Sequence, residues 1–424
     1  MSFQKTKLKS GLRVVTVPMK NANSVTVLLL VGTGSKYETK DISGISHFLE
    51  HMFFKGTQKR PNTLAISEVL DKIGGQYNAF TSKEVTGYWA KVDKKHTDVA
   101  LDWISDIFLN SKFDAEELER EKGVVTEELN MYLDMPQSHV GELFEELLYG
   151  DTPAGWQIVG TKETIAAYTR DKLIEYYHSH YSNDNTVICV AGDIDEKEIG
   201  QKLETLFATI QVRPAAEKLP VKEEQSKPGL LMHHKKTDQT HFCLGVRAYD
   251  MYDPRRFALQ LISVMLGGNM SSRLFISVRE RHGLGYYIHT SVDMATDTGY
   301  LVTQAGIKNN NLEKAVELVL KEYKDIRDNG VSEEELQKAK DYVRGSTSLS
   351  LDGTDTQASF YATQEVMNQP TLTPEEKLTM IDKVTVADIK EVAKDIFKNE
   401  KLNLSVIGAF EEKDKETFSN LLAL

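Results

Sequence analysis

Two histidines and a glutamate lie close together in HFLEH, residues 47–51, within the longer stretch DISGISHFLEHMFFKGT. His47 and His51 are four residues apart, so on a helix both imidazoles share one face and can reach a single metal ion. Glu50 lies beside that ion and can accept a proton from a water molecule. The alternative is a helix with two buried, hydrogen-bonded histidines and a surface glutamate. HxxEH arises by chance in about 4% of chains of this composition, so a metal site needs a third ligand.

The third ligand is expected on an acidic segment, FDAEELEREKGVVTEELNMYLDMP, residues 113–136. When this segment is drawn as a helix, Glu121 and Glu128 fall about 50° and 70° from the centre of its apolar face. Glu127 falls about 170° from that centre, in solvent. Most acids of the segment therefore form a solvated face, whereas Glu121 and Glu128 turn inward.

The motif needs regular elements around it to hold it in place. Its helix is expected from about Gly44 to Lys55 and closes at Gly56. Strands are expected before it, at Arg13–Val17 and Ser24–Gly32, and after it within residues 73–89, which follow a Gly-Gly turn.

The chain divides almost equally at residues 211–229, QVRPAAEKLPVKEEQSKPG, which hold three prolines, many charges and no apolar periodicity. Three short patterns recur across this linker in unchanged order: TGY (298 − 86 = 212 residues later), EEL (331 − 113 = 218, counted from the start of each segment) and a strand-ending glycine (408 − 192 = 216). We therefore predict two homologous domains, residues 1–210 and 230–424. Each is predicted to be α+β, with a mostly antiparallel sheet flanked by helices.

Composition excludes some classes of function. The chain has 424 residues and a net charge of −12, which argues against nucleic-acid and anionic-membrane partners. Its two cysteines, Cys189 and Cys243, lie in apolar stretches and indicate reduced core thiols. The first residues lack an apolar run long enough for a signal peptide or a membrane span, so we expect a cytoplasmic protein.

HxxEH followed by a glutamate 77 residues after its second histidine (128 − 51) resembles the inverzincin peptidases. These include pitrilysin, insulin-degrading enzyme and the mitochondrial processing peptidase. The resemblance implies that His47, His51 and Glu128 bind one Zn²⁺ per chain, with a fourth position open to water. It also implies that Glu50 is the general base and that Glu121 supports the site from the second shell of ligands.

Two further segments resemble the substrate-binding parts of this family. Asn78, Ala79 and Phe80 match an edge strand that pairs with an extended peptide through backbone hydrogen bonds. The alternative is an ordinary edge strand. In SSRLFISVRERHGLGYYIHT, Arg279 is followed seven residues later by Tyr286, and this pair matches residues that hold the substrate carbonyl and stabilise the oxyanion.

The two halves differ in these signatures. A shift of 218 residues takes Glu121 and Glu128 to Ala339 and Ser346, and the second half contains no HxxEH. Only the N-terminal half is therefore predicted to bind metal, and only the C-terminal half carries the Arg/Tyr pair.

The resemblance covers the whole chain, whose length matches one half of the family's clamshell. It implies a zinc endopeptidase that cuts unfolded peptides or presequence-like segments in a closed chamber. It also implies a homodimer in which Arg279 and Tyr286 act in trans. Three alternatives stay open: an active subunit that needs a degenerate paralogous partner, a non-catalytic scaffold subunit of the same fold, and a metal hydrolase with a non-peptide substrate.

Overall fold

The computed structural model describes residues 3–424. The chain separates into two compact units, each described here by itself. Unit 1 comprises Met1–Asn130, Gln157–Leu219 and Ser348–Pro374; unit 2 comprises Met131–Trp156, Pro220–Thr347 and Glu375–Leu424.

Unit 1 is built on a six-stranded sheet in the order β1-β2-β6-β3-β5-β4. Neighbouring strands are antiparallel except for the parallel pair β2 and β6. The strands are β1 (Gln4–Lys7), β2 (Arg13–Pro18), β3 (Ser24–Val31), β4 (Gln76–Thr81), β5 (Thr86–Asp93) and β6 (Thr186–Gly192). The helices are α1 (Ile45–Met52), α2 (Thr63–Asp71), α3 (Thr97–Asn110), most of α4 (Ala115–Asp134), α6 (Lys162–Ala167), α7 (Arg170–His180), α8 (Glu196–Leu206) and α12 (Thr354–Val366). The central strands β3 and β6 are rich in β-branched residues and almost wholly buried, as expected for strands covered on both faces.

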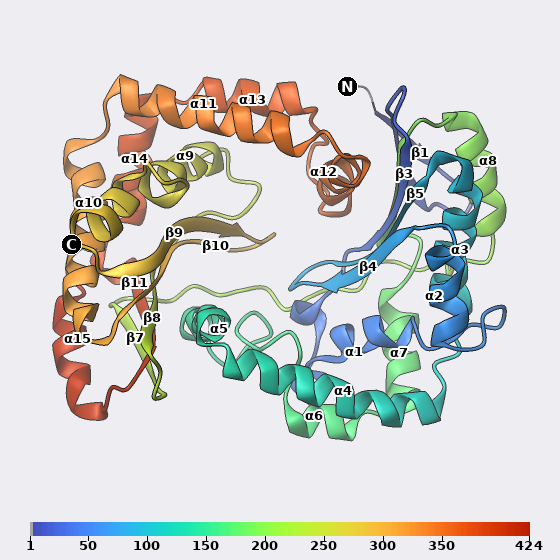
Figure 1. Ribbon diagram of the computed structural model, residues 1–424, viewed down its shortest axis with the longest axis horizontal. Helices are drawn as coiled ribbons and strands as arrows, with labels where there is room; N and C mark the ends of the chain where they lie inside the picture. Colours follow the sequence, from blue (N-terminus) through green and yellow to red (C-terminus); the bar gives the residue numbers. More distant parts are fainter. Residues whose placement is uncertain (1–2) are drawn as a thin grey trace. The chain divides into compact units, whose positions relative to one another are not determined.

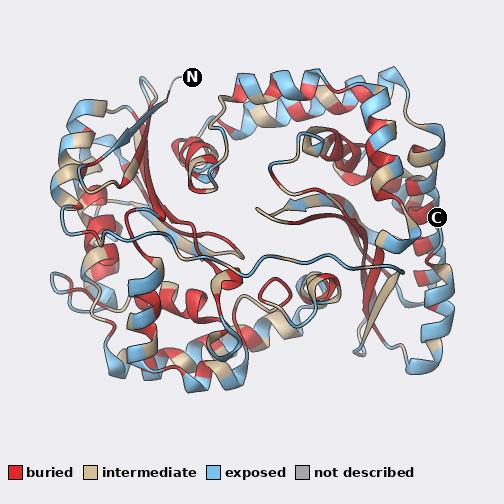
Figure 2. Cartoon of the chain, turned by 180° about the vertical axis from the view of Figure 1, so that it is seen from behind, coloured by how far each residue is buried: buried red, intermediate tan, exposed pale blue. Residues whose placement is uncertain are grey.

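Unit 2 is built on a five-stranded sheet in the order β7-β11-β8-β10-β9. Its strands are β7 (Gly229–His234), β8 (Gln239–Arg247), β9 (Gly285–Met294), β10 (Gly299–Lys308) and β11 (Leu402–Gly408). Its helices are α5 (Pro136–Tyr149), α9 (Arg256–Gly267), α10 (Leu312–Asn329), most of α11 (Glu333–Ser350) and α13 (Pro374–Asp382), α14 (Val386–Ile396) and α15 (Lys415–Leu421). Residues Phe275–Arg281 form a π-helical segment, η4. Figure 2 shows buried residues concentrated on the strands of both sheets and on the helix faces beside them.

The two sheets share one topology. The order β2-β6-β3-β5-β4 in unit 1 matches β7-β11-β8-β10-β9 in unit 2, and in both the first pair is parallel and the others antiparallel. The repeated sequence patterns fall on equivalent elements, because Gly192 and Gly408 end β6 and β11, and TGY opens β5 and β10. The predicted fold class, two α+β units with mostly antiparallel sheets flanked by helices, is confirmed.

One helix of each sequence half belongs to the other compact unit. Helix α5 packs its apolar face, including Phe144, on β11 and β8 of unit 2. Helix α12 packs Tyr361 and its neighbours on β3 and β6 of unit 1. Figure 1 shows α12 on the side of β3. The sequence predicts contiguous domains at 1–210 and 230–424, whereas the compact units exchange α5 and α12. Apolar periodicity shows that a helix buries one face but does not specify which sheet it covers.

Both cysteines, Cys189 and Cys243, are buried free thiols. Within residues 3–424, no helix combines the length and the apolar character needed to cross a lipid bilayer.

Candidate metal centre

Helix α1 carries HFLEH, and its start is fixed by its backbone and by a buried carboxylate. Gly44, which precedes the helix, has φ +93°, and a Cβ there would lie 2.3 Å from the carbonyl oxygen of Val159, so only glycine fits. The Glu38 carboxylate accepts hydrogen bonds from the backbone amides of Gly44 (2.6 Å) and Ser46 (2.8 Å). It therefore caps the helix. The capping role of Glu38 is not predicted from the sequence, because Glu38 lies six residues before Gly44, the normal capping position.

Two tyrosines also hold the start of α1. The Tyr176 hydroxyl on α7 lies 2.7 Å from the Ser46 hydroxyl, and the Tyr168 hydroxyl donates to the Ser43 carbonyl at 2.5 Å. The Tyr168 ring also packs edge-on against Phe48. Helix α1 is therefore anchored to the core at its first turn, so its position is set before any ligand binds.

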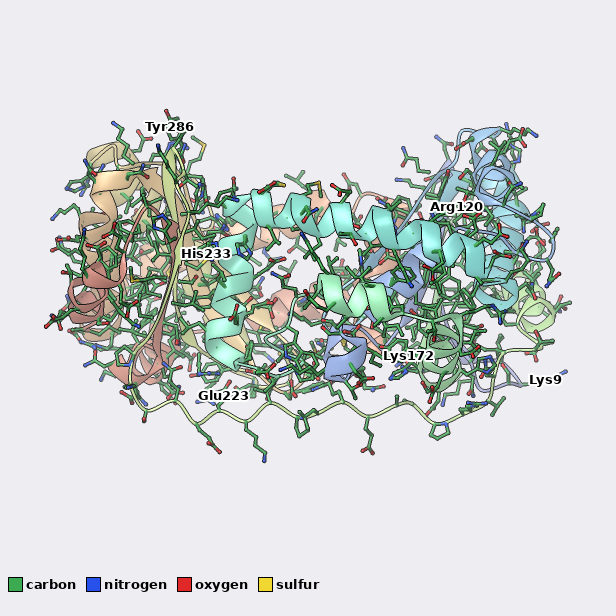
Figure 3. All side chains as sticks on the ribbon, turned by 90° about the horizontal axis from the view of Figure 1, so that it is seen from below. Lys9, Arg120, Lys172, Glu223, His233 and Tyr286 are labelled. Atoms are coloured by element: carbon green, nitrogen blue, oxygen red, sulfur yellow. The ribbon has the colours of Figure 1, made fainter. Side chains whose placement is uncertain are left out.

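Helix α4 supplies the carboxylates. Asp114 caps it by accepting a hydrogen bond from the Glu116 amide at 2.9 Å. Glu121 is 3% exposed, Glu128 is half-buried and Glu127 is exposed. The helical phase predicted from the sequence is therefore confirmed, with two acids turned inward. Figure 3 shows α4 from the side, with Arg120 labelled on it.

His47, His51 and Glu128 converge. One potential ligand atom from each lies within 4.8 Å of the other two. The Glu128 Oε2 atom is 3.3 Å from Nε2 of His51 and 3.7 Å from Nε2 of His47. Two ligand atoms on a tetrahedral zinc ion lie about 3.4 Å apart, so the spacing and the two-nitrogen, one-oxygen donor set both fit zinc. Within residues 3–424, this is the group of His, Cys, Asp and Glu side chains whose atoms are close enough to hold a metal ion.

Glu121 orients His51 from behind. Its Oε1 atom lies 2.8 Å from Nδ1 of His51, and its Oε2 atom lies 2.5 Å from Nζ of Lys55. With Nδ1–H donated to Glu121, Nε2 is the nitrogen of His51 that faces Glu128, and it would lose its proton to a metal ion bound there. Nδ1 of His47 is buried and has no hydrogen-bond partner among the described residues, so only one histidine is oriented in this way. The ion pair between Lys55 and Glu121 is not predicted from the sequence.

The electrostatics of the cluster favour a cation. Burial and the nearby His51 hold the pKa of His47 below its usual range, so its imidazole is neutral and able to bind a metal. Burial also lowers the pKa of His51, but its hydrogen bonds to Glu121 and Glu128 outweigh burial and raise the pKa overall. The two carboxylates therefore attract positive charge to the point where the three ligands meet.

Glu50 lies on α1 beside this cluster. Burial raises the pKa of Glu50, which makes its carboxylate a stronger base. The Thr81 hydroxyl on β4 donates a hydrogen bond to Oε2 of Glu50 at 2.5 Å. The base is thereby connected to the edge strand of the sheet.

Asn78, Ala79 and Phe80 lie on β4, which pairs with β5 on one side and forms the edge of the sheet. Asn78 and Phe80 are exposed, and Ala79 is half-buried. The Phe80 ring lies over Gly87 on β5, where an added Cβ would come within 2.5 Å of it. An edge strand is what an incoming extended peptide needs, and here the Ala79 amide donates to Oδ1 of Asn78 at 2.9 Å. The substrate-binding role remains a prediction.

Arg279 and Tyr286 lie in unit 2. Arg279 is exposed on η4, and its guanidinium lies over the Phe275 ring at 4.8 Å. Tyr286 is 70% exposed near the start of β9, where its side chain is labelled at the surface of the unit (Figure 3). Their catalytic role remains a prediction.

Two family models match this chain. Residues 13–162 match the family model "Insulinase (Peptidase family M16)", and residues 167–343 match "Peptidase M16 inactive domain". The "Uncharacterized zinc protease YmxG" of Bacillus subtilis is 37% identical over 389 residues, which cover 92% of this chain and 94% of that protein. The "Uncharacterized zinc protease SCO5738" of Streptomyces coelicolor is 30% identical over 428 residues, covering 100% and 93%.

Solved structures share the fold. A protease from Helicobacter pylori has a TM-score of 0.90 at 22% identity, covering 96% of this chain and 99% of that chain. A chain of Complex III2 from Candida albicans has a TM-score of 0.86 at 19% identity, covering 99% and 100%. The names of the relatives and the His-His-Glu cluster support a zinc peptidase. The chain belongs to peptidase family M16, the insulinase family.

Proposed function

We propose that this chain is a zinc endopeptidase that hydrolyses unfolded peptides or presequence-like segments. The observation that carries the proposal is the convergence of His47, His51 and Glu128 beside Glu50, next to an open edge strand. These three side chains would hold the zinc ion, which when bound supplies a Lewis acid to the reaction. Because the edge strand offers backbone hydrogen bonds, it suits extended peptides of varied sequence.

The chain's own residues would then do the following. Glu50 accepts a proton from the attacking water and later delivers it to the leaving amine. Glu121, held by Lys55, keeps His51 in the tautomer that presents Nε2 to the ion. A substrate segment pairs with Asn78, Ala79 and Phe80, which places its carbonyl beside the base.

Arg279 and Tyr286 are proposed to hold the substrate carbonyl and to stabilise the charge that develops on its oxygen. We propose that they act in trans within a homodimer that closes around a chamber. The alternative partner is a degenerate paralogue that supplies the same two residues. The charge of −12 remains an argument against nucleic-acid partners, and we propose that the enzyme works in the cytoplasm.

A scaffold of the same fold is the competing function, and a chain of Complex III2 shares this fold. The retention of three metal ligands together with Glu50 favours the peptidase, since a scaffold has no use for buried, partly desolvated ligands. The Arg/Tyr pair and the edge strand weigh against a hydrolase that acts on non-peptide substrates.

The test is cleavage of a quenched fluorescent peptide of about 20 residues, long enough to occupy a strand and the active site together. Wild type and Glu50→Gln are compared after zinc loading, with the zinc content of each measured. We expect wild type to cut the peptide and Glu50→Gln to bind zinc equally but to cut at least about 10³-fold more slowly. A zinc-loaded wild type that cuts nothing in a diverse peptide pool would contradict the proposal.

A further inference from the structure

Thr81 lies where the edge strand meets the base. It is the last residue of β4, and its hydroxyl donates to Oε2 of Glu50 at 2.5 Å. Strand β4 and helix α1 are in contact, and Thr81 is half-buried between exposed strand positions and the core. The hydroxyl is the hydrogen-bond donor that the structure assigns to the Glu50 side chain.

A glutamate needs such a partner to act as a base. Its side chain has three rotatable bonds, and its carboxylate must lie within hydrogen-bond reach of the proton that it accepts. A displacement of about 1 Å can slow a reaction by about 10²-fold. Glu50 is half-buried, and the Thr81 hydroxyl both satisfies its Oε2 atom and fixes the direction of the carboxylate.

We infer that Thr81 is a positioning residue that links peptide docking on β4 to the orientation of Glu50. Strand β4 is paired with β5 up to this residue, so the strand that a peptide is proposed to join also sets the position of Thr81. Thr81 then holds Oε2 of Glu50 and leaves Oε1 for the attacking water. This inference rests on the proposed peptidase function and assigns to it a residue that the motif does not contain.

A neighbouring threonine provides the matched control. Thr86 is paired with Thr81 across the β4–β5 ladder, is fully buried, and donates its hydroxyl to the Thr33 carbonyl at 3.0 Å. Its hydrogen bond joins the start of β5 to the segment after β3 and does not involve Glu50. If Thr81 only stabilised this end of the β4–β5 ladder, Thr81→Val and Thr86→Val should have similar effects on kcat.

The kinetic test compares zinc-loaded Thr81→Val, Thr81→Ser and Thr86→Val with wild type. We expect Thr81→Val to lower kcat by about 10- to 100-fold with less than about a threefold change in KM, because the hydroxyl acts on the base and not on binding. Thr81→Ser should restore kcat to within about threefold, and Thr86→Val should keep it while lowering Tm. Unchanged kcat in Thr81→Val, or no rescue by serine, would overturn the inference.

A second measurement does not depend on activity. In zinc-free protein, Thr81→Val and Glu50→Ala are made singly and together, and the Tm of each variant is measured. The two shifts should fall short of additivity by about 2 °C, since either change alone breaks the same hydrogen bond. Thr86→Val and Glu50→Ala should be additive. Additive Tm shifts for Thr81→Val and Glu50→Ala would overturn the hydrogen bond between the two residues. Non-additive shifts in a protein whose wild type cuts no peptide would overturn only the proposed peptidase function.

Discussion

The two units share a sheet topology but treat equivalent positions in opposite ways. Helix α1 in unit 1 follows β3 and carries the metal motif, whereas helix α9 in unit 2 follows β8 and buries mainly apolar residues. Glu121 on α4 corresponds to Ala339 on α11, which is buried in the apolar core of unit 2. The fold therefore needs only apolar contact at these places.

The carboxylate in unit 1 is costly by comparison. Removing a carboxylate from water costs several kcal/mol unless charged partners offset the loss. Lys55 and His51 supply those partners, and their hydrogen bonds lower the pKa of Glu121 although burial by itself would raise it. Because this group is expensive in one unit and absent from the other, we propose that Glu121 serves chemistry and not folding.

The first prediction concerns Glu128, a carboxylate that the equivalent position of unit 2 lacks. Glu128→Ala should lower zinc affinity by at least about 10³-fold and abolish peptide cleavage, because two histidines alone leave the ion weakly bound. Glu127→Ala, one residue away on the exposed face of α4, is the matched control and should change neither. Zinc titration and the peptide assay measure both effects. Equal zinc affinity in the two variants would show that Glu128 is not a ligand.

The second prediction separates the contributions of the units. Glu50→Gln and Arg279→Ala chains, each inactive alone, are mixed and allowed to exchange subunits. If Arg279 acts in trans, about a quarter of wild-type activity should return, since half of the dimers are mixed and each has one intact site. Native mass spectrometry verifies that mixed dimers form. Mixed dimers without activity would place Arg279 in cis.

The third prediction uses the exchanged helices. Phe144→Ala on α5 and Tyr361→Ala on α12 each empty a fully buried position and should cost about 3 kcal/mol of stability. Each should loosen the unit that its helix covers, not the sequence half that it comes from. Hydrogen exchange should therefore rise in β8 and β11 for Phe144→Ala and in β3 and β6 for Tyr361→Ala. Faster hydrogen exchange in β3 and β6 for Phe144→Ala, or in β8 and β11 for Tyr361→Ala, would contradict this assignment of the two helices.

The sequence predicts most of the fold and the centre of the site, for a physical reason. Helical period alone places His47 beside His51 and turns Glu121 and Glu128 inward, because both facts depend on residues within two turns of one helix. Strand patterns likewise predict β2 and β3 to within one residue.

The residues that sequence analysis missed act between elements. Thr81, Lys55 and Glu38 each contact the motif helix or its supporting acid through a single side chain, and no periodicity marks such a contact. A threonine at the end of a strand and a lysine after a helix are common everywhere. The exchange of α5 and α12 was missed for a related reason, since an amphipathic helix does not specify the sheet that it covers.

The last and smallest prediction concerns Glu38, which supports helix α1 of unit 1. Burial raises the pKa of Glu38 to about 7, and the Gly44 and Ser46 amides, with Lys83, offset only part of that effect. Tyr168 and Tyr176, which also face it, stay neutral below pH 9 because burial raises their pKa values. The folded protein therefore binds a proton that the unfolded chain has lost.

That proton makes stability fall as pH rises towards 7 and beyond, since a carboxyl with a raised pKa stabilises the fold only while it is protonated. From pH 6 to pH 8, wild type should lose about 1 kcal/mol of unfolding free energy relative to Glu38→Gln, whose amide does not titrate. Urea unfolding of zinc-free protein at both pH values measures the free energy of unfolding of each chain. Because wild type and Glu38→Gln have the same histidines, the contribution of histidine titration cancels when the two are compared. A difference that stays constant would mean that Glu38 is ionised throughout this range. The amides of α1 would then stabilise its charge more strongly than burial opposes it.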